Sequence, residues 1–290
     1  MSTSDSMKRA AKVLYDADAV LVTAGAGIGV DSGLPDFRGN NGFWKAYPPI
    51  ARLGISFVEM ANPEWFHTNP KLAWAFYGHR LNLYRETTPH DGFQQLLEIA
   101  GQKPGGYFVF TSNVDGHFQK AGYDEDRIEE CHGSIHHLQC NGPCGHDIWD
   151  AYNLEVTIDE EVFQALEPLP RCTQCGGIAR PNILMFGDWS WDGTRSQRQS
   201  ERLALWLRGI VEDGMRLAIV EMGAGTAVAT VRWKSEQVAR RTNGTLIRIN
   251  PRDTMIPPGP HFALPLGAAE AMGAIATSLK ELASSRKESC

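Results

Sequence analysis

The sequence predicts an α/β fold in which a parallel sheet with helices on both faces carries a second, smaller domain. Short apolar runs rich in β-branched and aromatic residues alternate with long intervals of helix-like spacing, which is typical of a parallel sheet built from βα units. The composition changes between residues 140 and 175, where cysteines lie at both ends of the segment and prolines interrupt it. We expect this segment to be a small module inserted into the larger domain.

Four apolar runs are the predicted strands of the parallel sheet. They cover residues 19–23, 107–111, 217–222 and 245–250, and Gly, Asn or Pro follows each of them closely. A shorter β-like run covers residues 128–131. The long intervals between these runs leave room for the helices that connect parallel strands.

Two patterns of apolar residues at helical spacing predict helices that pack against a core. The first follows Asn62-Pro63-Glu64, and its apolar residues are Leu72, Ala73, Phe76, Tyr77, Leu81 and Tyr84. The second lies near the end of the chain and places on one face Met272, Ile275, Leu279 and Leu282. Residues 284–290 are polar and are expected to form a frayed tail.

The composition excludes several classes of protein. The chain has 290 residues, 42% of them hydrophobic, which is enough for a large core. Its net charge of −6 offers no basic surface for nucleic acid or anionic membrane. Because the sequence holds neither an apolar run of membrane-spanning length nor a signal peptide, we expect a cytoplasmic protein, monomeric by default, with no nucleic-acid or membrane partner.

A glycine-rich turn directly follows the first predicted strand and reads GAGIGVDSGLPDFRG from Gly25 to Gly39. Glycines at such a turn let the backbone N–H groups approach a pyrophosphate. The spacing departs from the usual dinucleotide fingerprint, so a plain strand-to-helix connection is an equal alternative for the glycines alone. The acid, ring and guanidinium of Asp36-Phe37-Arg38 favour a nucleotide site, because a mere connection has no use for them.

Two close cysteine pairs predict a metal site. Cys140 and Cys144 form one pair and Cys172 and Cys175 the other, and four thiolates complete a tetrahedron around Zn²⁺ with no open position for a substrate. We therefore expect one structural zinc ion. Reduced core cysteines or two disulfides are the alternatives. Three nearby histidines could each replace a sulfur as a zinc ligand: His136, His137 and His146. The simpler interpretation is that they are solvated side chains.

Polar residues at two predicted strand ends are candidates for chemistry. Ser112, Asn113 and Asp115 follow the strand over 107–111, and the carboxyl ends of parallel strands are where open α/β sheets bind ligands. An ordinary turn would use the same residue types. His132 follows the run over 128–131 and could act as a general base near neutral pH, or could be structural.

Taken in order, these motifs resemble those of the sirtuins. The glycine loop through SGLPDFRG, the strand end SNVDG, the pair His132-Gly133, the four cysteines and PNILMFGD from Pro181 to Asp188 agree with that family over roughly residues 8–282. The resemblance implies a Rossmann-like domain from residues 8–40, 92–134 and 182–283. It implies a smaller domain with a helical part at 41–91 and a zinc module at 135–181.

Sirtuins consume NAD to remove acyl groups from protein lysine, releasing nicotinamide and O-acyl-ADP-ribose. The resemblance implies that His132 is the catalytic base and that Asn113 and Asp115 hold the ribose and the carboxamide. The positions that match cofactor contacts are Ala24, Gly25, Ala26, Gly27, Asp36, Phe37, Arg38, Ser112, Asn113, Asp115, Gly223, Ala224, Gly225, Asn250, Gly267 and Ala268. Met185, Phe186 and Gly187 would border the channel for the acyl-lysine of a protein or peptide substrate.

One helix refines the expected substrate. Tyr77 and Arg80 reproduce a Tyr-x-x-Arg pattern of sirtuins that accept succinyl or malonyl lysine, and the i,i+3 spacing puts both on one helical face. A phenol and a guanidinium together could hold a distal carboxylate. The plainer alternative is a core ring beside a solvated charge.

The chain also departs from the family pattern. Ser112 stands where most family members have Gln, Ala24 where Thr is usual, and Gly29 where Ser is usual. Gly223-Ala224-Gly225 stands in place of the usual Gly-Thr-Ser. These changes leave two alternatives to deacylation: an NAD-consuming ADP-ribosyltransferase or glycohydrolase, or an NAD-sensing or zinc-ribbon adaptor without turnover. Trp189 and Trp191 after the substrate motif would be anchors if exposed and core if buried.

Overall fold

Six parallel strands form the main sheet of the computed structural model, which describes residues 3–35, 39–142 and 144–287. Their order is β11-β10-β9-β1-β2-β3. The strands are β1 (Ala19–Ala24), β2 (Tyr107–Thr111), β3 (Ile128–Glu130), β9 (Leu217–Met222), β10 (Thr245–Ile249) and β11 (Phe262–Leu264). The predicted strands are confirmed to within a residue at each end, and β11 is an additional short strand at the edge of the sheet.

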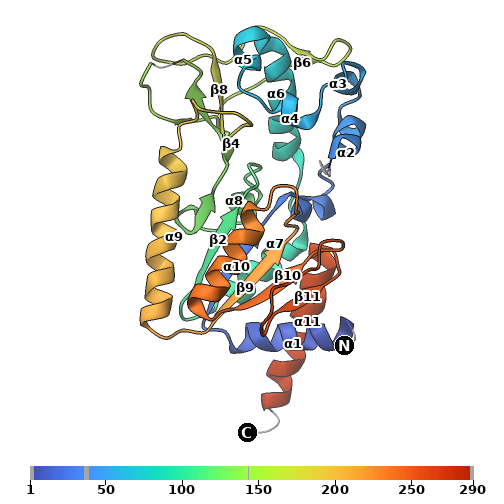
Figure 1. Cartoon of the computed structure of the whole chain (residues 1–290), viewed down its shortest axis with the longest axis vertical. Helices are drawn as coiled ribbons and strands as arrows, with labels where there is room; N and C mark the ends of the chain where they lie inside the picture. Colours follow the sequence, from blue (N-terminus) through green and yellow to red (C-terminus); the bar gives the residue numbers. More distant parts are fainter. Residues whose placement is uncertain (1–2, 36–38, 143, 288–290) are drawn as a thin grey trace.

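Helices cover both faces of this sheet, as the fold prediction requires (Figure 1). The helices on one face are α1 (Thr3–Asp16), α7 (Asp91–Gly101) and α11 (Ala268–Lys287), and those on the other are α9 (Thr194–Glu212) and α10 (Thr230–Thr242). Alternate residues of β1 serve the two cores, since Val20 and Val22 pack with the first group while Ala19 and Leu21 pack with the second. A strand buried on both faces therefore reads as a continuous apolar run.

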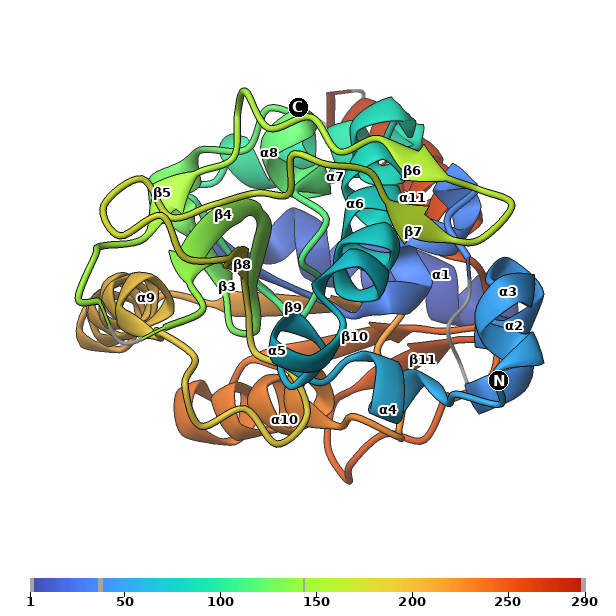
Figure 2. The same ribbon diagram turned by 90° about the horizontal axis from the view of Figure 1, so that it is seen from above.

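The smaller domain lies beyond the carboxyl ends of the main strands (Figures 1 and 2). Its sheet is antiparallel in the order β5-β4-β8, and two further strands, β6 and β7, form a hairpin. The strands are β4 (Gly133–Cys140), β5 (Trp149–Asp150), β6 (Ile158–Asp159), β7 (Gln164–Ala165) and β8 (Ala179–Ile183). Its helices are α2 (Gly39–Ala46), α3 (Pro48–Arg52), α4 (Phe57–Met60), α5 (Trp65–Thr68) and α6 (Pro70–Glu86).

Helix α6 forms the centre of the smaller domain's core. All six apolar residues that predict this helix are buried, and they pack with aromatic side chains from α2 and α5. Asn69 caps the helix, because its side-chain oxygen accepts from the N–H of Leu72, and Pro70 occupies the first turn. Asn62 and Pro63 instead precede the short helix α5.

Two strands and the last helix cross the residues at which the domains and the tail are expected to divide. Strands β4 and β8 pair with each other across the expected boundaries at 134/135 and 181/182, so both strands belong to the smaller sheet. The final helix α11 continues through Lys287, past the start of the expected polar tail at residue 284. Its apolar face packs on the core as predicted, with Met272 and Ile275 fully buried.

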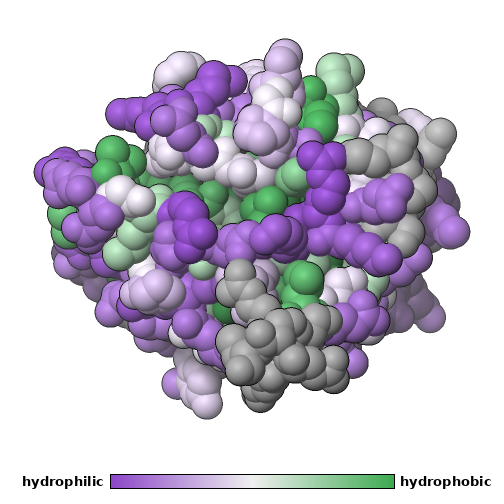
Figure 3. Space-filling view, turned by 90° about the horizontal axis from the view of Figure 1, so that it is seen from below, coloured by the Kyte–Doolittle hydropathy of each residue, from purple (hydrophilic) through white to green (hydrophobic). Residues whose placement is uncertain are grey.

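The amino ends of the main strands form the face opposite the smaller domain. Seen from that side, the surface is mostly hydrophilic, with hydrophobic side chains in small separate groups (Figure 3). None of the helices in the described ranges has the length and apolar character needed to cross a membrane. The residues expected to carry chemistry lie at the other end of the strands.

Candidate functional site

The carboxyl ends of four neighbouring strands bring the expected site loops to one edge of the main sheet. Ala24 at the end of β1 lies opposite Thr111 of β2 and Met222 of β9, and Thr111 lies opposite Glu130 of β3. The segments that begin at residues 25, 112, 131 and 223 therefore start side by side. Loops at this edge are where open α/β sheets bind ligands.

The glycine loop packs directly on the loop after β9. The N–H of Gly25 donates to the carbonyl of Met222 and that of Gly27 to the carbonyl of Gly223, each at 3.0 Å. Gly223 has a φ of +63°, and a Cβ there would lie 2.1 Å from the backbone nitrogen of Ile28. Only glycine fits this position, so Gly223 fixes how closely the two loops approach.

The loop after β10 is tied to the same assembly. Asn250 is fully buried, and its side-chain nitrogen donates to the carbonyl of Ala224 at 2.8 Å. Its oxygen accepts from the N–H of Asp253 at 3.0 Å. Both ends of the Asn250 amide are thus engaged, which gives this residue a clear part in shaping the loop besides any contact with a ribose.

Asp31 connects the glycine loop to the start of α11. Its carboxylate accepts from the N–H of Ala269 at 2.9 Å, and a Cβ on Gly267 would lie 2.8 Å from the same carboxylate. The structure therefore places Gly267 and Ala268 beside the short 3₁₀ helix η1 (Ala26–Ser32), as expected for parts of one cofactor site.

The loop after β2 holds a buried amide oxygen that has no hydrogen-bond partner among the described residues. This atom is Oδ1 of Asn113, whose side chain is buried and whose N–H donates to the Thr111 hydroxyl at 3.0 Å. The neighbouring Ser112 is half-buried, and its N–H donates to the carbonyl of Ala24 at 3.1 Å. A buried acceptor without a partner indicates a place where a ligand donor can bind.

Asp115 is held in place from two sides. Its carboxylate accepts from the N–H of His117 at 3.0 Å, and its carbonyl lies 2.9 Å from Nε2 of His136. His136 comes from strand β4 of the smaller domain, so it connects the two domains at the site. From the sequence, His136 is either a replacement zinc ligand or a solvated side chain, and no local motif signals the contact with Asp115.

His132 lies at the turn between β3 and β4. Burial lowers its pKa, and a hydrogen bond to the Ser112 backbone opposes that shift in part. Its carbonyl accepts from the N–H of Leu184 at 2.9 Å. Gly133 has a φ of +79°, and a Cβ there would lie 2.0 Å from the Asn182 carbonyl, which explains the glycine after the histidine. At neutral pH the imidazole is neutral.

The expected substrate motif forms an extension of strand β8. Met185 is buried, whereas Phe186 and Gly187 are exposed. The N–H of Phe186 donates to the carbonyl of Ala61 at 2.9 Å, which attaches the segment to the helical part of the smaller domain. Trp189 is 99% exposed, as an anchor would be. Trp191 is half-buried, and its indole N–H has no partner among the described residues.

Tyr77 and Arg80 are both buried in α6. The Tyr77 hydroxyl has no hydrogen-bond partner in the part of the chain that the structure describes, and burial raises its pKa. The Arg80 guanidinium donates to the Tyr84 hydroxyl at 2.9 Å and lies 5.7 Å from the centre of the Tyr77 ring. Tyr77 and Arg80 therefore lie close together, as their spacing predicts. The Arg80 guanidinium is buried, so the plainer alternative of a solvated charge is wrong.

The four predicted cysteines converge on one point. Their sulfur atoms all lie within 4.8 Å of one another, with Cys140 to Cys175 and Cys144 to Cys172 each at 3.6 Å. Zinc bound by sulfur at about 2.3 Å places its ligands about 3.8 Å apart in a tetrahedron, so the cluster fits one structural zinc ion. Two of the nearby histidines have other polar contacts: His146 lies 2.9 Å from the Thr173 hydroxyl and His136 lies 2.9 Å from the Asp115 carbonyl.

Asp36, Phe37 and Arg38 lie outside the described residues, so their expected part in cofactor binding stays a prediction.

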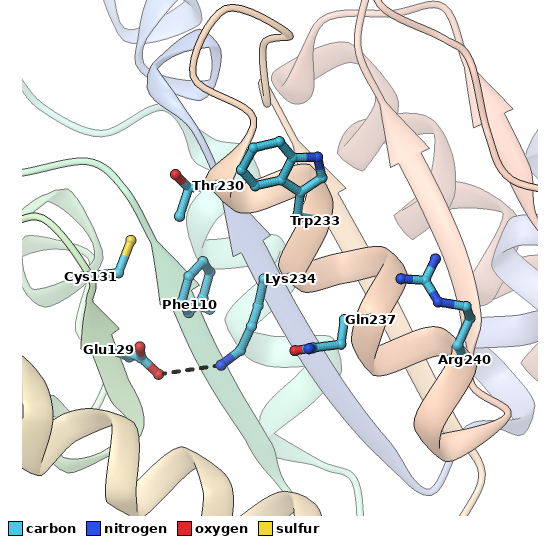
Figure 4. A pocket seen from close by; sticks show the side chains of 8 residues that line it. All are labelled: Phe110, Glu129, Cys131, Thr230, Trp233, Lys234, Gln237 and Arg240. Atoms are coloured by element: carbon cyan, nitrogen blue, oxygen red, sulfur yellow. Dashed lines mark ion pairs between the residues drawn. The ribbon is translucent and has the colours of Figure 1, made fainter.

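A hollow of about 440 Å³ lies beside α10. Lys234 in this hollow is 3.8 Å from Glu129 and 4.8 Å from the Phe110 ring centre (Figure 4). Of the expected cofactor residues that the structure describes, none lines this hollow. Its lining residues are Phe110, Glu129, Cys131, Thr230, Trp233, Lys234, Gln237 and Arg240.

Comparison with known proteins adds to this geometry. A model of the Sir2 family matches residues 25–202. The NAD-dependent protein deacylase of Leptospira interrogans is 30% identical over 229 residues, which cover 79% of each chain. That of Pyrococcus abyssi is 29% identical and covers 94% of this chain and 97% of its own. A Sir2 homolog–NAD complex shares the fold with a TM-score of 0.69 at 23% identity, covering 94% of this chain and 93% of that one.

Proposed function

Because the chain belongs to the Sir2 family, we propose that it is an NAD-dependent protein-lysine deacylase that yields nicotinamide and O-acyl-ADP-ribose. The names of the curated relatives support this activity. The observation that carries it furthest is the convergence of the glycine loop, Asn113, Asp115 and His132 at one edge of the sheet. A fold alone would not assign the reaction, but these side chains at this edge match its needs.

The residues present fit NAD. The glycine loop lies at the carboxyl end of β1, which is where open α/β sheets bind dinucleotides. The buried Asn113 oxygen without a partner is suited to accept from a ribose hydroxyl or a carboxamide. When bound, NAD supplies a ribose carbon that becomes electrophilic as nicotinamide leaves.

His132 is the proposed general base. A neutral imidazole has one ring nitrogen with a free lone pair, and this nitrogen of His132 can accept a proton from a ribose hydroxyl. The lowered pKa keeps this nitrogen unprotonated near neutral pH, as the role requires. General-base assistance of this kind contributes about 10²- to 10⁴-fold in rate. Asn113 and Asp115 orient the groups around that proton transfer.

The proposed substrate is an acyl-lysine in an extended polypeptide bound along the segment Met185 to Gly187. Tyr77 and Arg80 extend the proposal to succinyl or malonyl groups, because a buried phenol and guanidinium can together hold a carboxylate that an acetyl group lacks. We keep the cytoplasm as the proposed location, since the four paired cysteines form a metal-type cluster instead of disulfides.

Product analysis tests this function. NAD and an acetylated or succinylated peptide are incubated with the zinc-loaded protein, and the products are identified by mass spectrometry. O-acyl-ADP-ribose together with free lysine supports the proposal. Free ADP-ribose with intact acyl peptide indicates a glycohydrolase, ADP-ribose attached to protein indicates a transferase, and NAD binding without turnover indicates an adaptor.

A further inference from the structure

A buried ion pair lies directly beneath the proposed substrate segment. Arg180 of β8 and Asp188 are both without exposed side-chain surface, and the guanidinium engages both carboxylate oxygens, at 2.8 Å and 3.0 Å. This bidentate geometry is the strong form of the Arg–carboxylate interaction. Two charges removed from water need such complete pairing, because the loss of either partner leaves the other buried alone.

Asp188 also determines the path of the chain on both sides of it. Its carboxylate accepts from the N–H of Met185 at 3.3 Å and from the N–H of Ser190 at 3.2 Å. A second bond joins it to the Ser190 hydroxyl at 3.3 Å. One buried carboxylate therefore closes the loop from residue 185 to 190, which contains Phe186, Gly187 and the fully exposed Trp189.

The base of this loop is held by further polar contacts. Leu184 is bonded through its N–H to the carbonyl of His132. Beyond the loop, the side chain of Gln139 donates to the Ser190 carbonyl at 2.9 Å and accepts from the N–H of Asp192 at 3.1 Å. These contacts connect the loop to the catalytic histidine on one side and to the strand that ends at Cys140 on the other.

We propose that Arg180 and Asp188 are positioning residues that preform the loop 185–190 for the acyl-lysine polypeptide. The inference rests on the proposed deacylase function for the identity of the ligand. Neither residue need touch the substrate, since their effect passes through the backbone N–H groups that Asp188 orders. A loop that is already ordered avoids the entropy cost of ordering upon binding, so the pair acts on peptide affinity and leaves NAD binding alone.

The test compares two bidentate arginine–aspartate pairs, the buried pair Arg180–Asp188 and a partly exposed pair far from the loop. Asp188→Asn keeps the size of the side chain and removes its charge. The control is Asp18→Asn at the amino end of β1, because Asp18 also accepts two bonds from one arginine, Arg216, at 2.9 Å each and one from a backbone N–H. Steady-state kinetics with peptide and with NAD, and amide hydrogen exchange without ligands, are measured for both.

We expect Asp188→Asn to raise the KM for peptide by about tenfold or more, while the KM for NAD changes by less than about twofold. The amides of Met185 and Ser190 should exchange at least about tenfold faster than in the wild type. Asp18→Asn should change neither quantity. Arg180→Lys, which keeps the charge but loses the bidentate fork, should give an intermediate exchange rate.

The inference would be overturned if Asp188→Asn raised the KM for peptide and the KM for NAD equally. It would also be overturned if amide exchange at Met185 and Ser190 were unchanged in the variant. If Asp188→Asn does not fold, wild-type exchange decides, because rapidly exchanging Met185 and Ser190 amides would show that the loop is not preformed. The exchange measurement needs no activity. Slow exchange in a wild-type protein that turns over no acyl peptide would therefore refute the deacylase proposal and leave the ordering of the loop intact.

Discussion

Replacing Gly223 with alanine should damage the cofactor site in a way that can be separated from the general cost of losing a glycine. The left-handed conformation itself costs an alanine about 1–2 kcal/mol. The added Cβ would also lie 2.1 Å from the nitrogen of Ile28 and 2.4 Å from the carbonyl carbon of Gly27, and neither backbone atom can rotate away. Overpacking of this kind adds roughly 1–3 kcal/mol, so we expect a total loss of roughly 2–5 kcal/mol of unfolding free energy.

Gly214 supplies the matched control. Its φ of +64° is nearly that of Gly223, but no atom of the described residues lies within 4 Å of a Cβ placed there. Gly214→Ala should therefore lose only the conformational part, about 1–2 kcal/mol, and keep NAD binding. Urea unfolding and NAD titration of the two variants measure the difference. The reasoning is refuted if Gly223→Ala is as stable as Gly214→Ala and binds NAD as the wild type does.

Three further predictions concern the zinc cluster, pH and acyl selectivity. Chelation of zinc, or Cys172→Ser, should lower the melting temperature by about 10 °C or more, measured by calorimetry alongside metal analysis; an unchanged melting temperature would contradict a structural zinc. Burial, together with the charge of Arg195, lowers the pKa of His137 to about 4, so the folded state resists a proton that the unfolded chain accepts. Stability should therefore fall between about pH 6.5 and pH 4 by roughly 1–3 kcal/mol after solvent screening, and His137→Gln should flatten that slope in urea titrations. Tyr77→Phe should reduce kcat/KM for a succinyl peptide by about tenfold and that for an acetyl peptide by much less; equal effects would exclude the phenol from carboxylate recognition.

The main elements of the fold could be predicted from the sequence because their signals are local. The strand over Tyr107–Thr111 is an apolar run with a polar end, and the cysteine pairs carry their own spacing. The helix from Pro70 follows from its apolar stripe. The three residues of strand β11 are recognised as a strand only through their pairing with β10, which the sequence does not show.

The contacts that shape the site could not be predicted in the same way. His136 reaches the carbonyl of Asp115 across 21 positions, and Gly223 meets Ile28 across almost 200. Neither partner carries a local signal of the other. The PNILMFGD motif indicates a substrate segment, but only the structure shows that Asp188 pairs with a buried Arg180. Residues of this kind act through tertiary contacts, and those contacts exist only once the strands are paired.

The most direct test of the central claim is the release of nicotinamide from NAD with acetyl-lysine, succinyl-lysine and unmodified peptides, with His132→Ala as the control. We expect nicotinamide release to depend on an acyl peptide and to fall by about 10²-fold or more in the variant. Faster release with the succinyl peptide would also support the proposed role of Tyr77 and Arg80. Release at the same rate without any acyl group would contradict the deacylase assignment and indicate another NAD-consuming enzyme.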